Sequence, residues 1–229
     1  MFRLKRPMHD VELKSVAPLT STLVRLTLTG PTLSTFAIEF PTQWAKLAIP
    51  GGHSRAYTLR RHRPDRGELD LDVVLHGNGP LSRWAATARP GAPAKLSAPR
   101  GHRPSFDGAA RILLAADESG IPAALTILEQ LPPGTPVVAH FEIATAADTL
   151  HLATRADVTP VWLPREGAFA KGELLARSVS TVELPPGSAA WLAAEATAVD
   201  TARRHLLTTG AVSRDRLHAK GYWRRGKAS

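Results

Sequence analysis

The sequence of 229 residues contains no cysteine, and this absence excludes several kinds of chemistry. Without thiols the chain has no disulfide, no thiolate zinc site, no cysteine-ligated iron–sulfur cluster and no cysteine nucleophile. Any redox reaction that this protein carries out must therefore use a bound cofactor.

Long apolar runs are also missing. No stretch approaches the roughly 18 consecutive apolar residues of a membrane span, and the first residues, MFRLKRPMHDVELK, lack the apolar core of a secretory signal. We therefore expect a cytoplasmic protein without a membrane span. The content of 43% hydrophobic and 21% charged residues is that of a globular protein and argues against disorder or a coiled coil. The length allows one large domain or two small ones.

The net charge of +9 is unevenly distributed. Residues 1–106 hold sixteen basic and seven acidic residues, and residues 107–229 hold thirteen of each. Within the second half, the basic residues concentrate after residue 202. A nucleic-acid-binding protein would need such charge for phosphates, but no helix–turn–helix, zinc finger or aromatic–basic pattern is present. We therefore expect no nucleic-acid partner.

The first half is rich in predicted strands. Residues 11–16 and 23–29 alternate between apolar and polar, and shorter runs follow at the ranges 45–49, 55–61, 69–75 and 94–98. The alternation of acids with leucine and valine at 69–75 predicts a half-buried strand. Many short strands separated by turns are typical of a small antiparallel barrel.

The pattern changes near residue 107, which predicts a barrel at 1–106 and an α/β domain at 107–229. Apolar runs at 111–116, 136–143 and 189–194, with strand candidates at 159–163 and 216–222, alternate with helices expected at 122–131, 168–178 and 196–208. Such alternation indicates a parallel sheet covered on both faces. A barrel followed by a nucleotide-binding-like α/β domain recurs among flavin-dependent reductases.

The first segment whose side chains could bind a cofactor is Arg55-Ala56-Tyr57-Thr58-Leu59-Arg60, on a predicted strand. A flavin requires an aromatic face, a hydrogen-bond partner at the ring edge and fixed cations at its pyrophosphate. Strict alternation places Tyr57 and Thr58 on opposite faces, so a bulge or an edge geometry would have to bring both to one ring. The alternative is an exposed barrel strand with a row of arginines.

Two further segments follow strands. His76-Gly77-Asn78-Gly79-Pro80-Leu81-Ser82 offers glycines for close backbone approach and a helix start that suits a phosphate; the alternative is an ordinary turn in which Ser82 caps the helix. In Asp117-Glu118-Ser119-Gly120-Ile121-Pro122-Ala123, Asp117 is a candidate acceptor for adenine or ribose. No G-x-G-x-x-G motif occurs there, and Asp117 or Ser119 is equally well explained as a helix cap.

Neither a metal site nor an acid–base catalytic set is predicted. The histidines lack the spacing of metal ligands, and no serine, histidine and aspartate form a recognisable order.

In colinear order, six segments resemble the siderophore-interacting proteins, the FAD-dependent ferric-siderophore reductases of the ferredoxin–NADP reductase-like superfamily. They are 44–47, 55–60, 76–84, 117–123, 191–195 and 220–226, and together they extend the resemblance over nearly the whole chain. The family fold implied is an N-terminal antiparallel FAD-binding β-barrel followed by an α/β NAD(P)-binding-like domain.

The resemblance implies specific roles. FAD would be bound by residues of three segments: Arg55, Tyr57, Thr58 and Arg60; His76, Gly79 and Ser82; and Asp117, Ser119 and Ala123. Lys46 and Arg224 would dock an anionic ferric siderophore. Electrons would come from NADH, NADPH or a ferredoxin-type protein. Ala194 replaces the family's usual Gly, and Ser119-Gly120 replaces its usual Thr-Ala; the first change bears on the nicotinamide pocket.

Two other hypotheses remain open from the sequence. One is a general flavin or ferric-chelate reductase without a siderophore preference. The other, from a different class, is a non-catalytic basic protein that binds polyanions.

Overall fold

A computed structural model describes residues 8–77 and 79–226. The chain divides into two compact units between Arg103 and Pro104, three residues before the boundary suggested by the sequence. Each unit has its own sheet and its own hydrophobic core.

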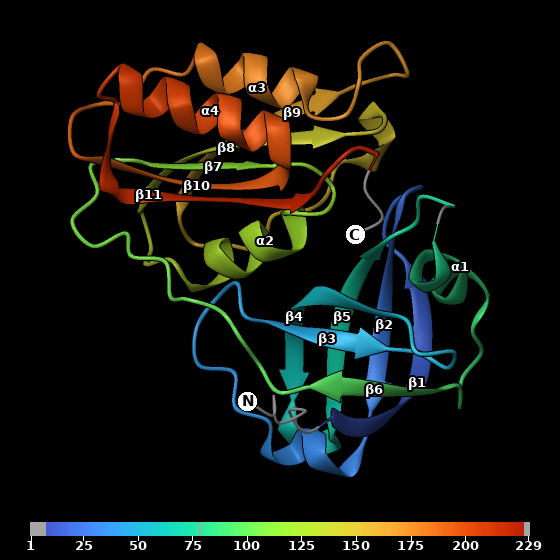
Figure 1. Ribbon diagram of the computed structural model, residues 1–229. Coiled ribbons are helices and arrows are strands. Elements are labelled where there is room, and N and C mark those ends of the chain that lie inside the picture. The colour runs from blue at the N-terminus through green and yellow to red at the C-terminus, as the bar shows by residue number, and fades with distance from the viewer. Residues whose placement is uncertain (1–7, 78, 227–229) are drawn as a thin grey trace, which may run out of the picture. The chain divides into compact units, whose positions relative to one another are not determined.

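The first unit is a closed antiparallel barrel, as the sequence predicted (Figure 1). Its strands run in the order β1-β2-β5-β4-β3-β6, and α1 lies between β5 and β6 in the chain. The bounds are β1 Met8–Pro18, β2 Leu23–Thr29, β3 Trp44–Ala48, β4 Ser54–Arg63, β5 Glu68–Val74, α1 Pro80–Thr87 and β6 Pro93–Ser97, with 3-10 turns at Pro31–Thr35 and Pro64–Arg66. Fully buried leucines from all six strands fill the interior: Leu13, Leu26, Leu28, Leu47, Leu59, Leu69, Leu71 and Leu96.

The prediction that β5 is half-buried was wrong, because its acidic face is buried as well. Glu68, Asp70 and Asp72 are each at most 4% exposed. They form an ion-pair network, the β5 network, with basic residues of neighbouring strands: Lys14–Glu68, Arg25–Asp72 at 2.8 Å, Arg60–Asp72 at 3.1 Å, Arg63–Glu68 at 2.7 Å and Arg63–Asp70 at 2.6 Å. Buried carboxylates require such partners because desolvation otherwise makes their charge costly.

The β5 network predicts a loss of stability in acid. Hydrogen bonds from Lys14 and Arg63 lower the pKa of Glu68 to about 2. Burial opposes ionisation of Asp70, but Arg63 and Thr27 outweigh it and lower that pKa too. Both folded-state values lie below those of the unfolded chain, about 4, so the stabilisation is present above about pH 5 and is lost toward pH 2. Melting temperatures should fall through this window, and the fall should be smaller in Arg63→Gln, which starts from a lower value at pH 7.

The second unit is a five-stranded parallel sheet in the order β11-β10-β7-β8-β9, again as predicted. The bounds are β7 Ile112–Ala116, α2 Ile121–Gln130, β8 Pro136–Ile143, β9 Asp157–Pro164, α3 Glu173–Ser180, β10 Ser188–Glu195, α4 Ala196–Thr208 and β11 Val212–Trp223, with a 3-10 turn at Ala146–Asp148. Helix α2 covers one face of the sheet, and α3 and α4 cover the other (Figure 1).

Two elements begin four or five residues away from their predicted starts. Helix α3 begins at Glu173 rather than near residue 168, because Gly167 and Gly172 adopt positive φ angles of 73° and 88° and these turns interrupt any earlier helix. Strand β11 begins four residues before the predicted start, since Val212 pairs with Ser188 of β10.

The strand order reverses between β7 and β10, and α2 begins against that position. A Cβ on Gly120 would lie 2.0 Å from the carbonyl oxygen of Ala193 in β10. The absence of a side chain at residue 120 is therefore required for α2 to approach the sheet.

Gly120→Ala should cost about 3 kcal/mol of stability, the upper end of overpacking effects, because a backbone atom has to move. Gly134→Ala is the matched control, since its Cβ would meet nothing within 4 Å and only the positive φ of 72° is unfavourable; it should cost about 1 kcal/mol. Denaturant unfolding measures both. Equal losses would contradict the steric explanation.

Candidate functional site

The segment at residues 55–60 lies on β4, and its register with β3 divides its side chains between two faces. Arg55 pairs with Leu47 and Tyr57 with Ala45, so these side chains share one face. Thr58 pairs with Trp44, which places Thr58 on the opposite face together with Lys46. A bulge does occur in β4, but only after Leu59. Tyr57 and Thr58 therefore remain on opposite faces in this structure.

Arg55 and Tyr57 present a cation beside an aromatic ring. In the described part of the chain, the Arg55 guanidinium makes no ion pair and donates only to the backbone oxygen of Ser54, at 2.7 Å. Tyr57 is partly exposed and packs against the barrel core. Burial raises the pKa of Tyr57 to about 12, with the Arg55 charge opposing the rise. At neutral pH this pair is one fixed positive charge and one neutral phenol.

Arg60 does not share this arrangement. Its side chain is 2% exposed and its Nε donates to Asp72 within the β5 network. The bulge after Leu59 turns this residue inward. Contrary to the expectation from the sequence, Arg60 stabilises the barrel and is not an available cation for a phosphate.

A glycine-containing turn joins β5 to α1. Gly77 and Gly79 have φ angles of 70° and 89°, and a Cβ on Gly79 would come within 3.7 Å of the His76 ring. The buried Ser82 hydroxyl accepts a hydrogen bond from the His76 backbone N–H, at 3.0 Å. Ser82 therefore fixes the turn to the first turn of α1, where free backbone N–H groups favour an anion.

Arg55 and this turn lie at the same end of the barrel. Strand β4 begins there, β5 ends there, and β2 begins there, because Leu23 pairs with Val74. The Leu75 N–H donates to the Thr22 carbonyl at 2.7 Å. The Thr22 hydroxyl at this end is buried and has no hydrogen-bond partner within residues 8–77 and 79–226.

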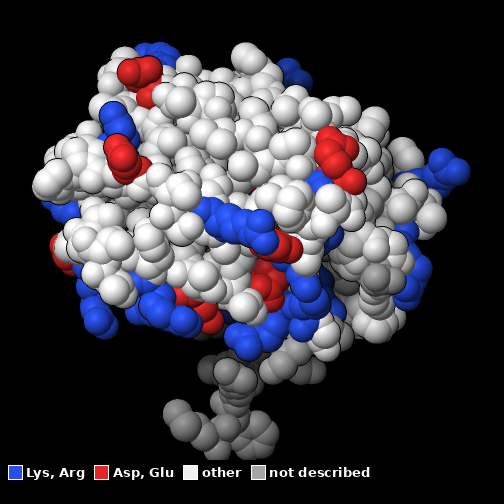
Figure 2. Space-filling model, turned by 90° about the horizontal axis from the view of Figure 1, so that it is seen from above, with Lys and Arg blue, Asp and Glu red and all other residues white. Residues whose placement is uncertain are grey.

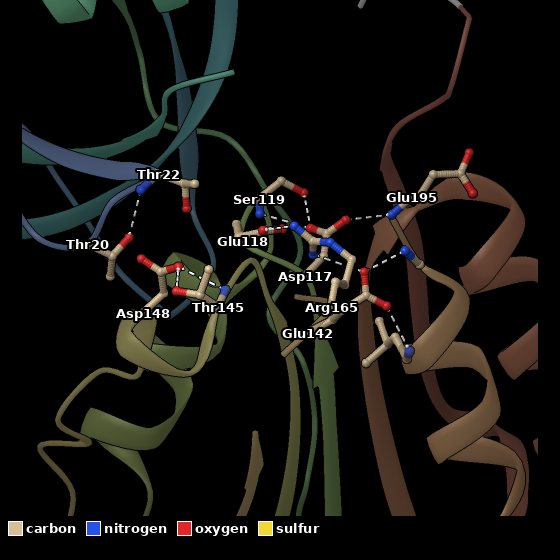
Figure 3. Close-up of polar contacts among 12 residues, drawn as sticks. Thr20, Thr22, Asp117, Glu118, Ser119, Glu142, Thr145, Asp148, Arg165 and Glu195 are labelled. Atoms are coloured by element: carbon tan, nitrogen blue, oxygen red, sulfur yellow. Dashed lines mark hydrogen bonds and ion pairs between the residues drawn. The ribbon is translucent and has the colours of Figure 1, made fainter. Parts of the chain in front are cut away.

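In the second unit, Asp117 joins the ends of three strands (Figure 3). One carboxylate oxygen accepts from the Glu195 N–H at 3.0 Å and from the Trp223 indole at 2.7 Å. The other accepts from the N–H and the hydroxyl of Ser119, at 2.9 and 2.5 Å. Burial raises the pKa of Asp117, and the bonds from Ser119 and Trp223 oppose the rise. We name these four residues the Asp117 cluster.

This geometry corrects the expectation for the adenosine-binding turn. Asp117 is 1% exposed and has protein donors on both oxygens, so it positions strands rather than receiving adenine or ribose. Ala123 is fully buried in α2 and offers no surface to a ligand. Ser119 alone of the three remains partly exposed.

The sequence reading missed a buried charged group at the carboxyl ends of β7, β8 and β9. Arg165 forms ion pairs with Glu118 and, at 3.1 Å, with Glu142 (Figure 3). Glu142 also accepts from the backbone N–H groups of Gly172 at 2.6 Å and Leu175 at 2.9 Å. The sequence does contain a signal for this group, because Glu118, Glu142 and Arg165 each occur at or just after the end of one of these three apolar strands.

Arg224 lies directly after β11 and is exposed, and Lys46 is exposed on β3. Figure 2 shows one face of the molecule on which Lys and Arg side chains gather along the lower margin while much of the surface carries no charge. Among the residues that the structure describes, no cluster of three potential metal ligands occurs. None of the helices described has the length and hydrophobicity needed to cross a bilayer.

Comparisons with known proteins define the class. The family model "Siderophore-interacting FAD-binding domain" matches residues 50–103, and "Siderophore-interacting protein" matches residues 109–226. The ferric vibriobactin reductase ViuB of Vibrio cholerae is 31% identical over 231 residues, covering 90% of this chain and 85% of ViuB.

Comparison with solved structures supports the same similarity. A siderophore utilization protein from T. fusca superposes with a TM-score of 0.87 at 31% identity, covering 97% of this chain and 94% of that one. A ferredoxin reductase in carbazole 1,9a-dioxygenase shares the fold, with a TM-score of 0.75 at 20% identity, covering 97% of this chain and 71% of that one.

A barrel with a matching FAD-binding domain, followed by this parallel sheet, defines a flavin-dependent oxidoreductase. Within that class, the chain belongs to the siderophore-interacting protein family.

The residues at the barrel end fit FAD. A neutral aromatic ring, a guanidinium and a buried hydroxyl that find no side-chain partner among the described residues, and a glycine turn at a helix start suit an isoalloxazine and a pyrophosphate.

Arg55→Ala should weaken FAD binding about tenfold to a hundredfold, because a charge-assisted hydrogen bond contributes about 1.5–3 kcal/mol. Arg61→Ala, an exposed arginine on the same strand, is the control. Titration of apoprotein with FAD, followed by flavin fluorescence, gives both affinities. If the two variants bind FAD equally well, Arg55 is not a pyrophosphate ligand.

Asp117→Asn should lower the stability of the second unit by about 2 kcal/mol, because an amide nitrogen replaces an oxygen that accepts hydrogen bonds. FAD affinity should change little. Ser119→Ala, which removes only the hydroxyl bond, should cost less. A variant that melts like the wild type but loses FAD affinity would restore Asp117 as a nucleotide ligand.

Proposed function

We propose that this protein reduces ferric siderophores in the cytoplasm with electrons from NADH or NADPH, and so releases iron as Fe(II). The observation that carries this proposal is the FAD-compatible barrel end in a chain of the siderophore-interacting family. ViuB, of which the alignment covers 85%, is named a ferric vibriobactin reductase. A ferredoxin-type protein is the alternative electron donor.

The reaction follows from the chemistry of iron. Siderophore oxygens are hard anionic ligands that hold Fe(III) tightly and Fe(II) much less tightly. One NAD(P)H supplies two electrons and leaves NAD(P)⁺ and a proton, so it balances the reduction of two ferric ions. When bound, FAD accepts electrons in a pair and passes them on singly.

The chain's own residues would hold and orient these reactants. Tyr57 would pack against the flavin ring. Arg55 and the backbone of the His76–Ser82 turn would neutralise and orient the pyrophosphate. Exposed cations would attract the chelate.

An anaerobic experiment tests the function. Purified protein reduced with dithionite and mixed with a ferric siderophore should be reoxidised, while an Fe(II) chelator reports stoichiometric iron release. A simple ferric chelate that reacts equally fast would favour the general ferric-chelate reductase. A colourless protein that cannot be reconstituted with FAD would favour the polyanion-binding protein.

Lys46 and Arg224 are the proposed docking cations. Replacing both with Ala should leave FAD bound and lower the second-order rate with an anionic ferric siderophore several-fold, because surface charge steers encounter. Added salt should shrink the difference, since the Debye length is about 8 Å at physiological ionic strength. Arg89→Ala with Arg214→Ala, two exposed arginines elsewhere, is the control pair. Stopped-flow rates that are equal in all three proteins would exclude Lys46 and Arg224 as docking cations.

A further inference from the structure

Helix α3 is short, and polar side chains of β8 attach it to the sheet. It has eight residues, fewer than the roughly 12–15 that an isolated helix needs in water. Its buried residues are Leu175 and Val179. At its start, the Glu142 carboxylate accepts hydrogen bonds from the backbone N–H groups of Gly172 at 2.6 Å and Leu175 at 2.9 Å. The helix therefore depends on a small number of contacts with the sheet.

The second attachment is an imidazole beneath the middle of the helix. His140 is 5% exposed, and its Nδ1 atom lies 2.7 Å from the hydroxyl oxygen of Ser178 in α3. It precedes Glu142 by two residues on β8, so both side chains point to the same face of the sheet. The proposed function does not use this titratable group.

Across the sheet, His140 has apolar neighbours. It lies beside Ala115 of β7 and Val161 of β9. On its own strand and face, the ionisable neighbour is Glu142, whose oxygens already accept from two backbone N–H groups and from an arginine. A proton gained by His140 would therefore place a positive charge in a poorly solvated position.

The other charged groups near α3 pair with one another. Arg165 forms an ion pair with Glu118 as well as with the acid of β8. Glu173 pairs with Arg177 on α3 itself, at 2.6 Å. Among the residues that the structure describes, none forms an ion pair with His140. Burial lowers the pKa of His140 below its ordinary value of 6.5, so the imidazole is neutral at pH 7 while α3 is packed.

The charge of this imidazole links the packing of α3 to pH. When the helix moves away and water reaches the ring, the pKa returns toward 6.5. The open state then binds the proton more readily than the packed state. The stabilisation of the packed helix is therefore complete above about pH 6.5 and decreases as the pH falls toward the lower value, by at most about tenfold per pH unit for one proton. The β5 network loses its stabilisation only below about pH 5, so the two effects occur in different windows.

We propose that His140 makes α3 an acid-sensitive element, which opens locally from the sheet when the imidazole gains a proton. This inference goes beyond the proposed function and does not depend on it.

Hydrogen–deuterium exchange of the holoprotein, followed by mass spectrometry between pH 7.5 and pH 5, tests the proposal. After correction for the intrinsic pH dependence of exchange, the opening equilibrium of α3 should rise by up to about tenfold per pH unit below pH 6.5, while α4 stays protected. His140→Gln should remove this dependence, because its amide can bond to Ser178 but cannot gain a charge. His151→Gln, which replaces an exposed histidine of the same unit, is the matched control and should retain it.

Ser178→Ala separates the charge from the hydrogen bond. The pH dependence should remain in this variant, because the buried imidazole is still present, and its loss would contradict the proposal. NMR titration of His140 in the wild type requires no variant, and a pKa at or above 6.5 would overturn the proposal. So would exchange of α3 that does not change with pH, an equal response of α4, or the same pH dependence in His140→Gln as in His151→Gln.

Discussion

The carboxylate of Asp117 holds together the carboxyl edge of the parallel sheet. It accepts hydrogen bonds from the next turn of its own loop, from the backbone at the end of β10 and from the indole at the end of β11. Strands β7, β10 and β11 are distant in sequence, and a buried carboxylate with fewer donors would be costly. The close approach of Gly120 to β10 and the positions of Glu195 and Trp223 are part of this arrangement.

Buried carboxylates in the barrel also need partners, but there the partners are charged side chains. The β5 network engages Lys14, Arg25, Arg60 and Arg63 with buried or nearly buried acids. The basic excess of the first half is thus not simply a surface property. What distinguishes Arg55 from Arg60, five residues along one strand, is that Arg55 pairs with no carboxylate in the part of the chain that the structure describes. Unpaired cations, rather than total charge, mark the places where an anionic ligand gains most.

Local sequence patterns were sufficient to predict most of the fold. Two-residue alternation indicated the barrel strands, and apolar runs between helices indicated the parallel sheet. The family and its FAD cofactor could be predicted because six short segments that resemble the family occur in the same order in this chain. The roles of individual residues were harder to predict, because Arg60, Asp117 and Ala123 have the residue types of a binding site and are buried inside the protein. Their burial depends on the bulge in β4, on Trp223 more than one hundred residues away and on α2 packing against the sheet.

The sequence by itself determined the class of fold, the need for a borrowed redox cofactor and the segments around which a flavin site is built, since periodicity, composition and motifs are local properties. Only the tertiary structure decided which charged side chains pair with one another inside the protein and which remain available to bind ligands. An acid or a cation acquires its partner across strands, as Arg25 does with Asp72 and Arg165 with Glu142, and that pairing depends on register and strand order.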